Sequence, residues 1–108
     1  MNSVNLIGNL VADAEMRFTT SGKAVANFSV AHNKKLKDEE KASFFDCVIW
    51  DKAAEALTKY LVKGKKVGLT GELNQRRWKT DAGENRSKVE IIVYNVDFLS
   101  KREESEIF

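Results

Sequence analysis

The chain contains no proline, one cysteine, one histidine and six glycines among its 108 residues. A single cysteine excludes an internal disulfide framework and a cysteine metal cluster. The single histidine, His32, has no paired nucleophile signature, and the glycines follow no phosphate-loop spacing. The sequence also lacks a run of about 20 apolar residues and a signal-peptide pattern at its start. We therefore expect a cytoplasmic protein without membrane contact, metal or cofactor.

The length and the hydrophobic content of 43% suffice for one domain with a core, and the chain is too short for two domains. We place this domain at residues 1–100 and a short acidic tip at residues 101–108. The formal net charge is +2, but it becomes +5 for residues 1–102, because the last six residues hold three acids and no base. A mildly basic body favours a polyanionic partner. On charge alone, the tip is more typical of a solvated, frayed terminus.

Alternating apolar side chains predict five strands, at residues 4–10, 24–32, 43–50, 66–79 and 88–99. Gly8 marks an expected bulge or bend. Residues 52–63 have helical spacing, with Asp51 as the expected N-cap and Gly64 as the terminator. The charged stretch 34–41 is expected to be a loop or a hairpin arm. This order predicts an all-β protein, a five-stranded OB-fold barrel with one helix between strands 3 and 4, although a generic α+β sheet shares the order.

The most informative segment is 74–79, which places a tryptophan among three cations. In a strand, Arg76 and Trp78 share one face, and Arg77 and Lys79 share the other. An indole beside a guanidinium on an exposed sheet is a platform for a planar, anionic partner, and nucleic-acid bases fit that description. Taken alone, Trp78 is equally typical of the edge of a core.

The expected third strand has two different faces. One face sets an acid between aromatic rings, which a sealed core does not accept, and consists of Phe44, Asp46, Val48 and Trp50. The other face is wholly apolar and is expected in the core: Phe45, Cys47 and Ile49. An OB barrel binds its ligand on strands 2 and 3 and on two of its loops. We therefore expect three aromatic rings from separate segments to converge on one groove, namely Phe44, Trp50 and Trp78.

Basic residues flank both expected arms. The arm between strands 2 and 3 has Lys34, Lys35, Lys37 and Lys41, and the arm between strands 4 and 5 has Arg76, Arg77, Lys79, Arg86 and Lys88. Two cationic arms suit a flexible phosphate backbone. The lysines of 34–41 are interleaved with three acids, so a solvated loop is an equally good interpretation of that stretch.

Six sequence segments follow one another along the chain in an order that is typical of a known family: VNLIGNL at 4–10, RFTTSG at 17–22, AVANF at 24–28, WDKAAE at 50–55, YLVKG at 60–64, and GEL at 71–73 leading to RRW at 76–78. Through these segments the chain resembles bacterial single-stranded DNA-binding proteins, over residues 2 to 99. The resemblance implies an OB-fold that binds single-stranded DNA with little sequence preference. It also implies a role in DNA replication, recombination and repair, as a homotetramer at the nucleoid.

The resemblance also implies roles for individual residues. The base-stacking aromatics of the family fall on Phe44, Trp50 and Trp78, and its cations fall on Arg17, Lys52, Lys63, Arg76 and Arg86. Leu36 stands where a further stacking tryptophan is common, which predicts weaker binding or a shorter footprint. Other basic positions of the family are lost at Ser3, Val62 and Asn74. Phe45 falls at a position associated with subunit contacts.

The tip departs most from the family, whose members often have a long Gly/Pro/Gln-rich linker before an acidic end. Here that linker is missing, yet a shortened tip without its proline remains in Glu103, Glu104, Glu106, Ile107 and Phe108. The resemblance therefore favours a docking peptide for replication and repair proteins over a frayed terminus. An anionic segment on so short a tether also competes with DNA for the basic groove.

Two other interpretations stay open. One is a protein-interaction module similar to primosomal replication protein N, an OB dimer that scaffolds a helicase loader; the retained aromatics and cations argue against it. The other is an enzyme acting on nucleic acid, for which the sequence offers no acid–base or metal constellation. We therefore predict a binding protein that is not an enzyme.

Overall fold

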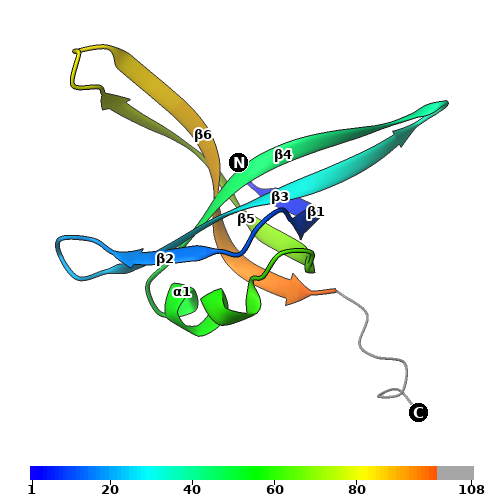
Figure 1. The fold of residues 1–108 in the computed structure, drawn as a ribbon, viewed down its shortest axis with the longest axis horizontal. Coiled ribbons are helices and arrows are strands. Elements are labelled where there is room, and N and C mark those ends of the chain that lie inside the picture. The colour runs from blue at the N-terminus through cyan, green and yellow to red at the C-terminus, as the bar shows by residue number, and fades with distance from the viewer. Residues whose placement is uncertain (100–108) are drawn as a thin grey trace.

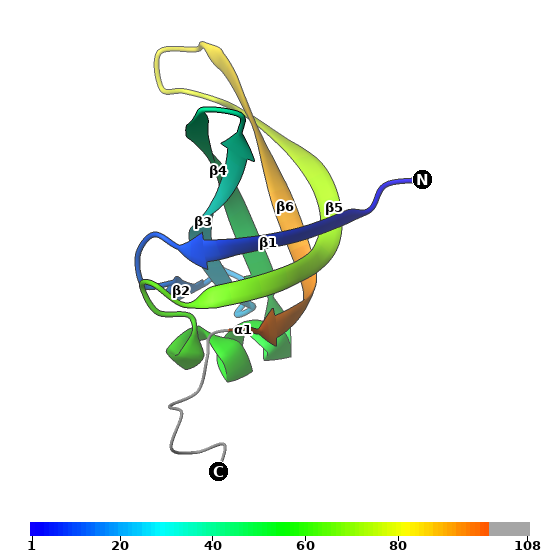
Figure 2. The same cartoon turned by 90° about the vertical axis from the view of Figure 1, so that its right-hand side faces the viewer.

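The structure, a computed structural model, describes residues 1–99. Its elements are β1 (Val4–Leu10), β2 (Glu15–Phe18), β3 (Ala24–Leu36), β4 (Glu39–Trp50), α1 (Asp51–Leu57), a short 3-10 helix η1 (Thr58–Tyr60), β5 (Lys66–Lys79) and β6 (Asn85–Phe98). The strands form one sheet in the order β1-β5-β6-β4-β3-β2. Because β1 also pairs with β3, five of these strands close into a barrel, with α1 at one end (Figures 1 and 2). The predicted OB-fold barrel is confirmed.

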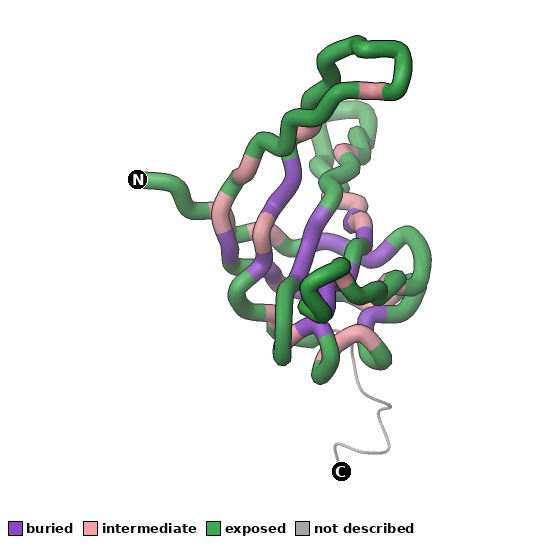
Figure 3. Tube along the Cα trace, turned by 90° about the vertical axis from the view of Figure 1, so that its left-hand side faces the viewer, coloured by how far each residue is buried: buried purple, intermediate pink, exposed green. Residues whose placement is uncertain are grey.

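The barrel interior is filled by the residues whose alternation predicted the strands. Ala24, Ala26, Phe28 and Val30 of β3 are all buried, and they pack with Leu10, Ile49, Leu69 and Ile91 of the neighbouring strands. Figure 3 shows that the buried segments lie within the barrel, whereas the arms are exposed. This rigid core leaves the outer surface of the barrel and the arms to carry function.

Gly8 does not form the expected bulge. It pairs in register with Val67, and a Cβ atom on it would lie 2.8 Å from the carbonyl oxygen of Ala31. Glycine is therefore required here because β1 crosses β3 closely as the barrel closes. The irregularity in register lies instead between Thr70 and Gly71 of β5.

The helix is shorter than expected and begins differently. Asp51 is not a capping residue: the N-cap is Trp50, no side chain caps the helix, and Asp51 itself has a φ of +59°. The α-helix ends at Leu57 and a 3-10 turn continues to Tyr60. Of the expected apolar face, Leu61 is buried but Tyr60 is 51% exposed. No helix within residues 1–99 combines the length and apolar character needed to cross a membrane.

Two long hairpins project from the barrel and diverge (Figure 1). The charged stretch 34–41 is a hairpin arm: β3 and β4 stay paired out to Leu36 and Glu39. The second arm pairs β5 with β6 out to Lys79 and Asn85, so β6 begins three residues earlier than residue 88, where we expected it. β2 was not predicted at all, and it adds to the free edge of β3.

Candidate functional site

β4 presents two aromatic rings on the outside of the barrel. Phe44 is 67% exposed and Trp50 is 40% exposed. Asp46 lies between them and is also exposed, so the prediction of a solvated face is confirmed for these three residues. Val48 differs, since it is buried where β4 runs between β3 and Ile92 of β6.

The opposite face of β4 enters the core only in part. Cys47 and Ile49 are buried as expected, but Phe45 is 37% exposed, so its assignment to the core is wrong. Phe45 belongs to a hollow that also includes Leu73 and Val89, which are exposed as well. These three apolar side chains form an uncovered rim patch at the end of the barrel from which the arms project.

The β5–β6 arm holds a stacked cation–aromatic pair. The guanidinium carbon of Arg76 lies 4.6 Å from the centre of the Trp78 ring. On the same side, Arg76 Nε lies 3.6 Å from an Oε1 oxygen of Glu90, which is buried. The predicted sharing of one face by Arg76 and Trp78 is confirmed. This ion pair holds the guanidinium over an indole that remains partly exposed.

The aromatic residues of β4 and β5 belong to one outer face of the sheet. Trp78 stands opposite Arg86, and alternation along β6 then puts Lys88 on the same side. Lys88 Nζ lies 3.2 Å from Oδ2 of Asp46, which joins the arm to β4. The rings nevertheless line separate hollows, so the structure does not gather them into a single pocket.

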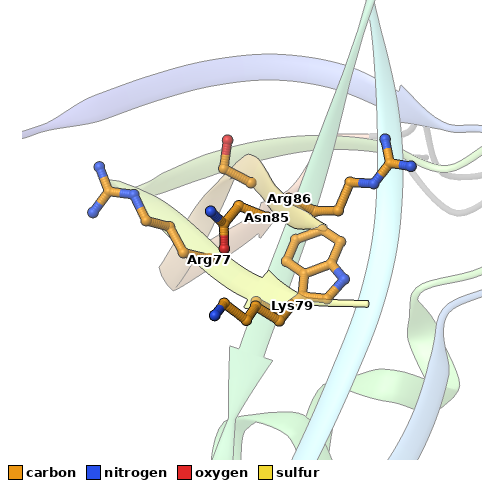
Figure 4. A pocket seen from close by; sticks show the side chains of 6 residues that line it. Arg77, Lys79, Asn85 and Arg86 are labelled. Atoms are coloured by element: carbon orange, nitrogen blue, oxygen red, sulfur yellow. The ribbon is translucent and has the colours of Figure 1, made fainter. Parts of the chain in front are cut away.

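The hollow at the tip of the β5–β6 arm is rich in cations. It is lined by Arg77, Trp78, Lys79, Asn85, Arg86 and Ser87. Figure 4 shows Arg77, Lys79, Asn85 and Arg86 arranged around it. Arg86 also pairs with Glu84 at 2.8 Å, and Arg77 donates a hydrogen bond to Gln75. These contacts are exposed, so a phosphate group competes for the same guanidinium groups at little cost.

A second hollow surrounds Trp50. Lys23 of the β2–β3 turn and Lys52 of α1 line it together with the indole. Arg17 of β2 stands opposite Val25, which in turn stands opposite Trp50. Register therefore brings Arg17 to the side of the sheet that carries Trp50.

The remaining predicted cations are spread over other surfaces. Lys35 alternates onto the side of Phe44, Lys34 onto the opposite side, and Lys37 lies in the turn at the arm's tip. Lys63 lies in the turn before β5, where its backbone N–H donates to Asp13. The predicted tip residues, Glu103, Glu104, Glu106, Ile107 and Phe108, lie outside the described residues.

Sequence reasoning missed several residues of these hollows, among them Lys23, Asn85 and Ser87. Asn85 and Ser87 stand opposite Lys79 and Arg77, so the register of the hairpin is the signal that identifies them. Lys23 follows the predicted turn, but only the fold brings it next to Trp50. Within residues 1–99, no three histidine, cysteine, aspartate or glutamate side chains gather closely enough to hold a metal ion.

Comparison with known proteins identifies the family. The model of the single-strand binding protein family matches residues 1–99. The chain belongs to this family. A single-stranded DNA-binding protein of Treponema pallidum is 45% identical over 103 residues, and one of Borreliella burgdorferi is 42% identical over 105 residues. These alignments cover 92% and 93% of the chain, and 58% and 70% of the two relatives. The chain thus spans little more than half the length of the Treponema protein.

A solved structure of a Plasmodium falciparum SSB in complex with ssDNA has the same fold. It superposes with a TM-score of 0.82 at 30% sequence identity and covers 93% of this chain and 96% of the other. The single-strand binding protein family is a family of DNA-binding rather than catalytic proteins, which confirms the prediction that the chain is not an enzyme.

Proposed function

We propose that this protein binds single-stranded DNA of any sequence and protects it during DNA replication, recombination and repair. The observation that supports this most directly is the Arg76–Trp78 stack on an exposed arm, on the same outer face as Phe44 and Trp50. Aromatic rings offer stacking surfaces to any base, and the surrounding cations follow the phosphate backbone. Membership of the single-strand binding protein family supports the same function.

We assign stacking to three rings and phosphate contacts to the cations around them. The stacking residues are Phe44, Trp50 and Trp78. The phosphate-binding residues are Arg17, Lys34, Lys35, Lys37, Lys52, Lys63, Arg76, Arg77, Lys79 and Arg86. Leu36, at the end of β3, offers no aromatic surface on its arm, so the strand is held there by charge alone.

The test is a fluorescence titration, because the chain contains only two tryptophans and both belong to the proposed site. Oligo-dT of several lengths is added at low and high salt, with duplex DNA of matching length as the control. We expect quenching by the single strand alone. The logarithm of the binding constant should fall with the logarithm of salt concentration, by about 0.7 per neutralised phosphate. Absence of quenching, or an equal response to duplex, would favour a protein-interaction module instead.

The proposal includes a homotetramer. Phe45, Leu73 and Val89 leave an apolar rim patch uncovered, and burial of such a patch between subunits is favourable. A tetramer would also allow one strand to pass over several binding faces. Light scattering on the purified protein at several concentrations gives the number of subunits directly.

The proposal also assigns partner recruitment to the acidic tip. Three glutamates followed by Ile107 and Phe108 combine charge with an apolar end, which suits a basic, apolar docking groove on replication or repair proteins. Removal of residues 103–108 should abolish capture of such partners. The same removal should preserve or tighten DNA binding, because it eliminates an anionic competitor for the cationic face. We place this activity in the cytoplasm, at the nucleoid.

A further inference from the structure

One acid stands in the middle of the proposed DNA-binding face. Asp46 lies on the outer surface of β4, two residues from Phe44 and four residues from Trp50, and its side chain is 48% exposed. Successive residues on one face of a strand are about 6.8 Å apart. A carboxylate at this position repels phosphate, so binding of the backbone alone does not account for it.

Asp46 is held in a defined orientation by residues from two neighbouring strands. The hydroxyl of Ser29 on β3 donates a hydrogen bond of 2.5 Å to Oδ1, and Lys88 Nζ on β6 lies 3.2 Å from Oδ2. The hydrogen bond from Ser29, assisted by Lys88, holds the pKa of Asp46 below its usual value. The group is therefore an anion at neutral pH.

The carboxylate has acceptor capacity left for a ligand. An ionised carboxylate offers about four lone-pair positions, and Ser29 and Lys88 each occupy one. The remaining positions lie on a half-exposed group that lines the same hollow as Phe44. A base that stacks on Phe44 brings its edge to this acceptor.

The edges of the bases differ in what they offer to an anion. Cytosine carries an exocyclic amine at C4, and carboxylates are the side chains that accept from this amine. Uracil and thymine carry a carbonyl oxygen at the same atom, and their ring N–H lies between two carbonyl oxygens. An acceptor oxygen of Asp46 thus attracts the amine of cytosine and repels the carbonyl oxygens of uracil and thymine.

We infer that Asp46 is a specificity-determining residue, which accepts a hydrogen bond from the exocyclic amine of a base stacked on Phe44. The protein then binds every sequence but binds amino-bearing bases more tightly than uracil or thymine. This inference rests on the proposed function, since it concerns the same face. Ser29 and Lys88 are positioning residues, because they act by fixing the carboxylate.

The test compares oligo-dC with oligo-dU of equal length, because these strands differ in the amine and carbonyl at C4 without the methyl group of thymine. Binding is measured at mildly alkaline pH, where cytosine is unprotonated. For Asp46→Asn we expect the ratio of dC to dU affinity to fall about three- to tenfold, the worth of one hydrogen bond. Asp97→Asn is the matched control: it removes one acid at the far end of β6, and the ratio should not change.

Ser29→Ala provides a second variant, which keeps the charge of Asp46 but releases its orientation. In this variant we expect a ratio of dC to dU affinity between that of the wild type and that of Asp46→Asn. If Asp46→Asn strengthens binding to both strands by the same factor, the acid acts on phosphate alone and the inference is wrong. An unchanged ratio in both variants contradicts it equally. A wild-type protein that binds neither strand would instead refute the proposed function, and the two failures are therefore distinguishable.

Discussion

Arg76 stacks on Trp78, with its guanidinium carbon 4.6 Å from the ring centre. The contact occupies one side of the indole, and Trp78 remains 39% exposed. Glu90 holds the same guanidinium through an ion pair at 3.6 Å. The pair therefore sets a cation next to an exposed aromatic surface on the arm, which is the combination that the proposed contacts with a phosphate and a base require.

From this arrangement we predict that Trp78→Ala weakens binding of single-stranded DNA by about 1–3 kcal/mol. The free energy of unfolding should change little, because the ring stands on an exposed arm outside the core. Fluorescence anisotropy of a labelled oligonucleotide, which does not depend on the tryptophans of the protein, measures the binding, and urea denaturation measures the free energy of unfolding. Trp50→Ala should behave in the same way. A large loss of stability in both variants would mean that the rings are structural.

The rim patch leads to a prediction about assembly. Phe45→Asp places a charge on the patch that Phe45 forms with Leu73 and Val89, so subunit contacts made through it should be lost. Light scattering should report a smaller mass than that of the wild type. Phe18→Asp is the matched control: Phe18 is 60% exposed on β2, outside the patch, and its substitution should leave the mass unchanged. Equal masses for all three proteins would exclude this patch as the interface.

The hydrogen bond between Ser29 and Asp46 makes stability depend on pH. Because the pKa of Asp46 is lowered in the folded protein, its ionised form adds stability above the unfolded pKa of about 3.9. That stability is lost as the pH falls through the lower, folded pKa. Ser29→Ala should therefore cost of order 1 kcal/mol at neutral pH. The cost should shrink in acid, below the unfolded pKa.

Urea denaturation of the wild type and of Ser29→Ala, at neutral and at acid pH, checks this prediction. The background variant Asp46→Asn is the control, because it has no carboxylate to titrate at this position. In that background the effect of Ser29→Ala should be independent of pH. A cost that is the same at every pH in the otherwise unchanged protein would show that Ser29 acts through packing rather than through the charge of Asp46.

Much of the barrel could be predicted because its strands alternate cleanly. The apolar residues of β3 that face the core, Ala24, Ala26, Phe28 and Val30, repeat every second position, and the shared face of Arg76 and Trp78 follows from the same geometry. β2 was missed because it is only four residues long: Met16 and Phe18 alternate with Glu15 and Arg17, but all four residues are exposed and none of them marks a core face. Alternation also failed for Phe45, which lies on the interior side of its strand but beyond the end of the packed core.

The positions of glycines required the three-dimensional structure. A glycine in a strand signals either a bulge or a close approach, and the sequence does not distinguish them. At Gly8 the structure shows a close approach to β3. At Gly71 a Cβ atom would lie 2.0 Å from the carbonyl oxygen of Ile92, next to the register shift. Likewise, only the register of the parallel β4–β6 pair brings Lys88 to Asp46.

Cys47 gives a chemical test of the core. Its side chain is 1% exposed, and its Sγ lies 3.7 Å from the carbonyl oxygen of Phe45. Burial, followed by the nearby charges of Asp46 and Glu90, raises the pKa of the thiol to about 12. Only the thiolate attacks disulfide reagents, so native Cys47 should be inert at mildly alkaline pH.

Labelling of this thiol should therefore require unfolding of the barrel. We expect a rapid stoichiometric reaction in denaturant and a reaction in native buffer that is limited by opening of the fold. Ile49→Val, which removes one buried methyl group from the same strand face, should destabilise the protein by about 0.5–1.5 kcal/mol and speed native labelling accordingly. Trp78→Ala should leave the labelling rate unchanged, because its ring lies on the arm. Fast labelling of the native wild-type protein would contradict the burial of Cys47, and with it the placement of the interior face of β4 in the barrel core.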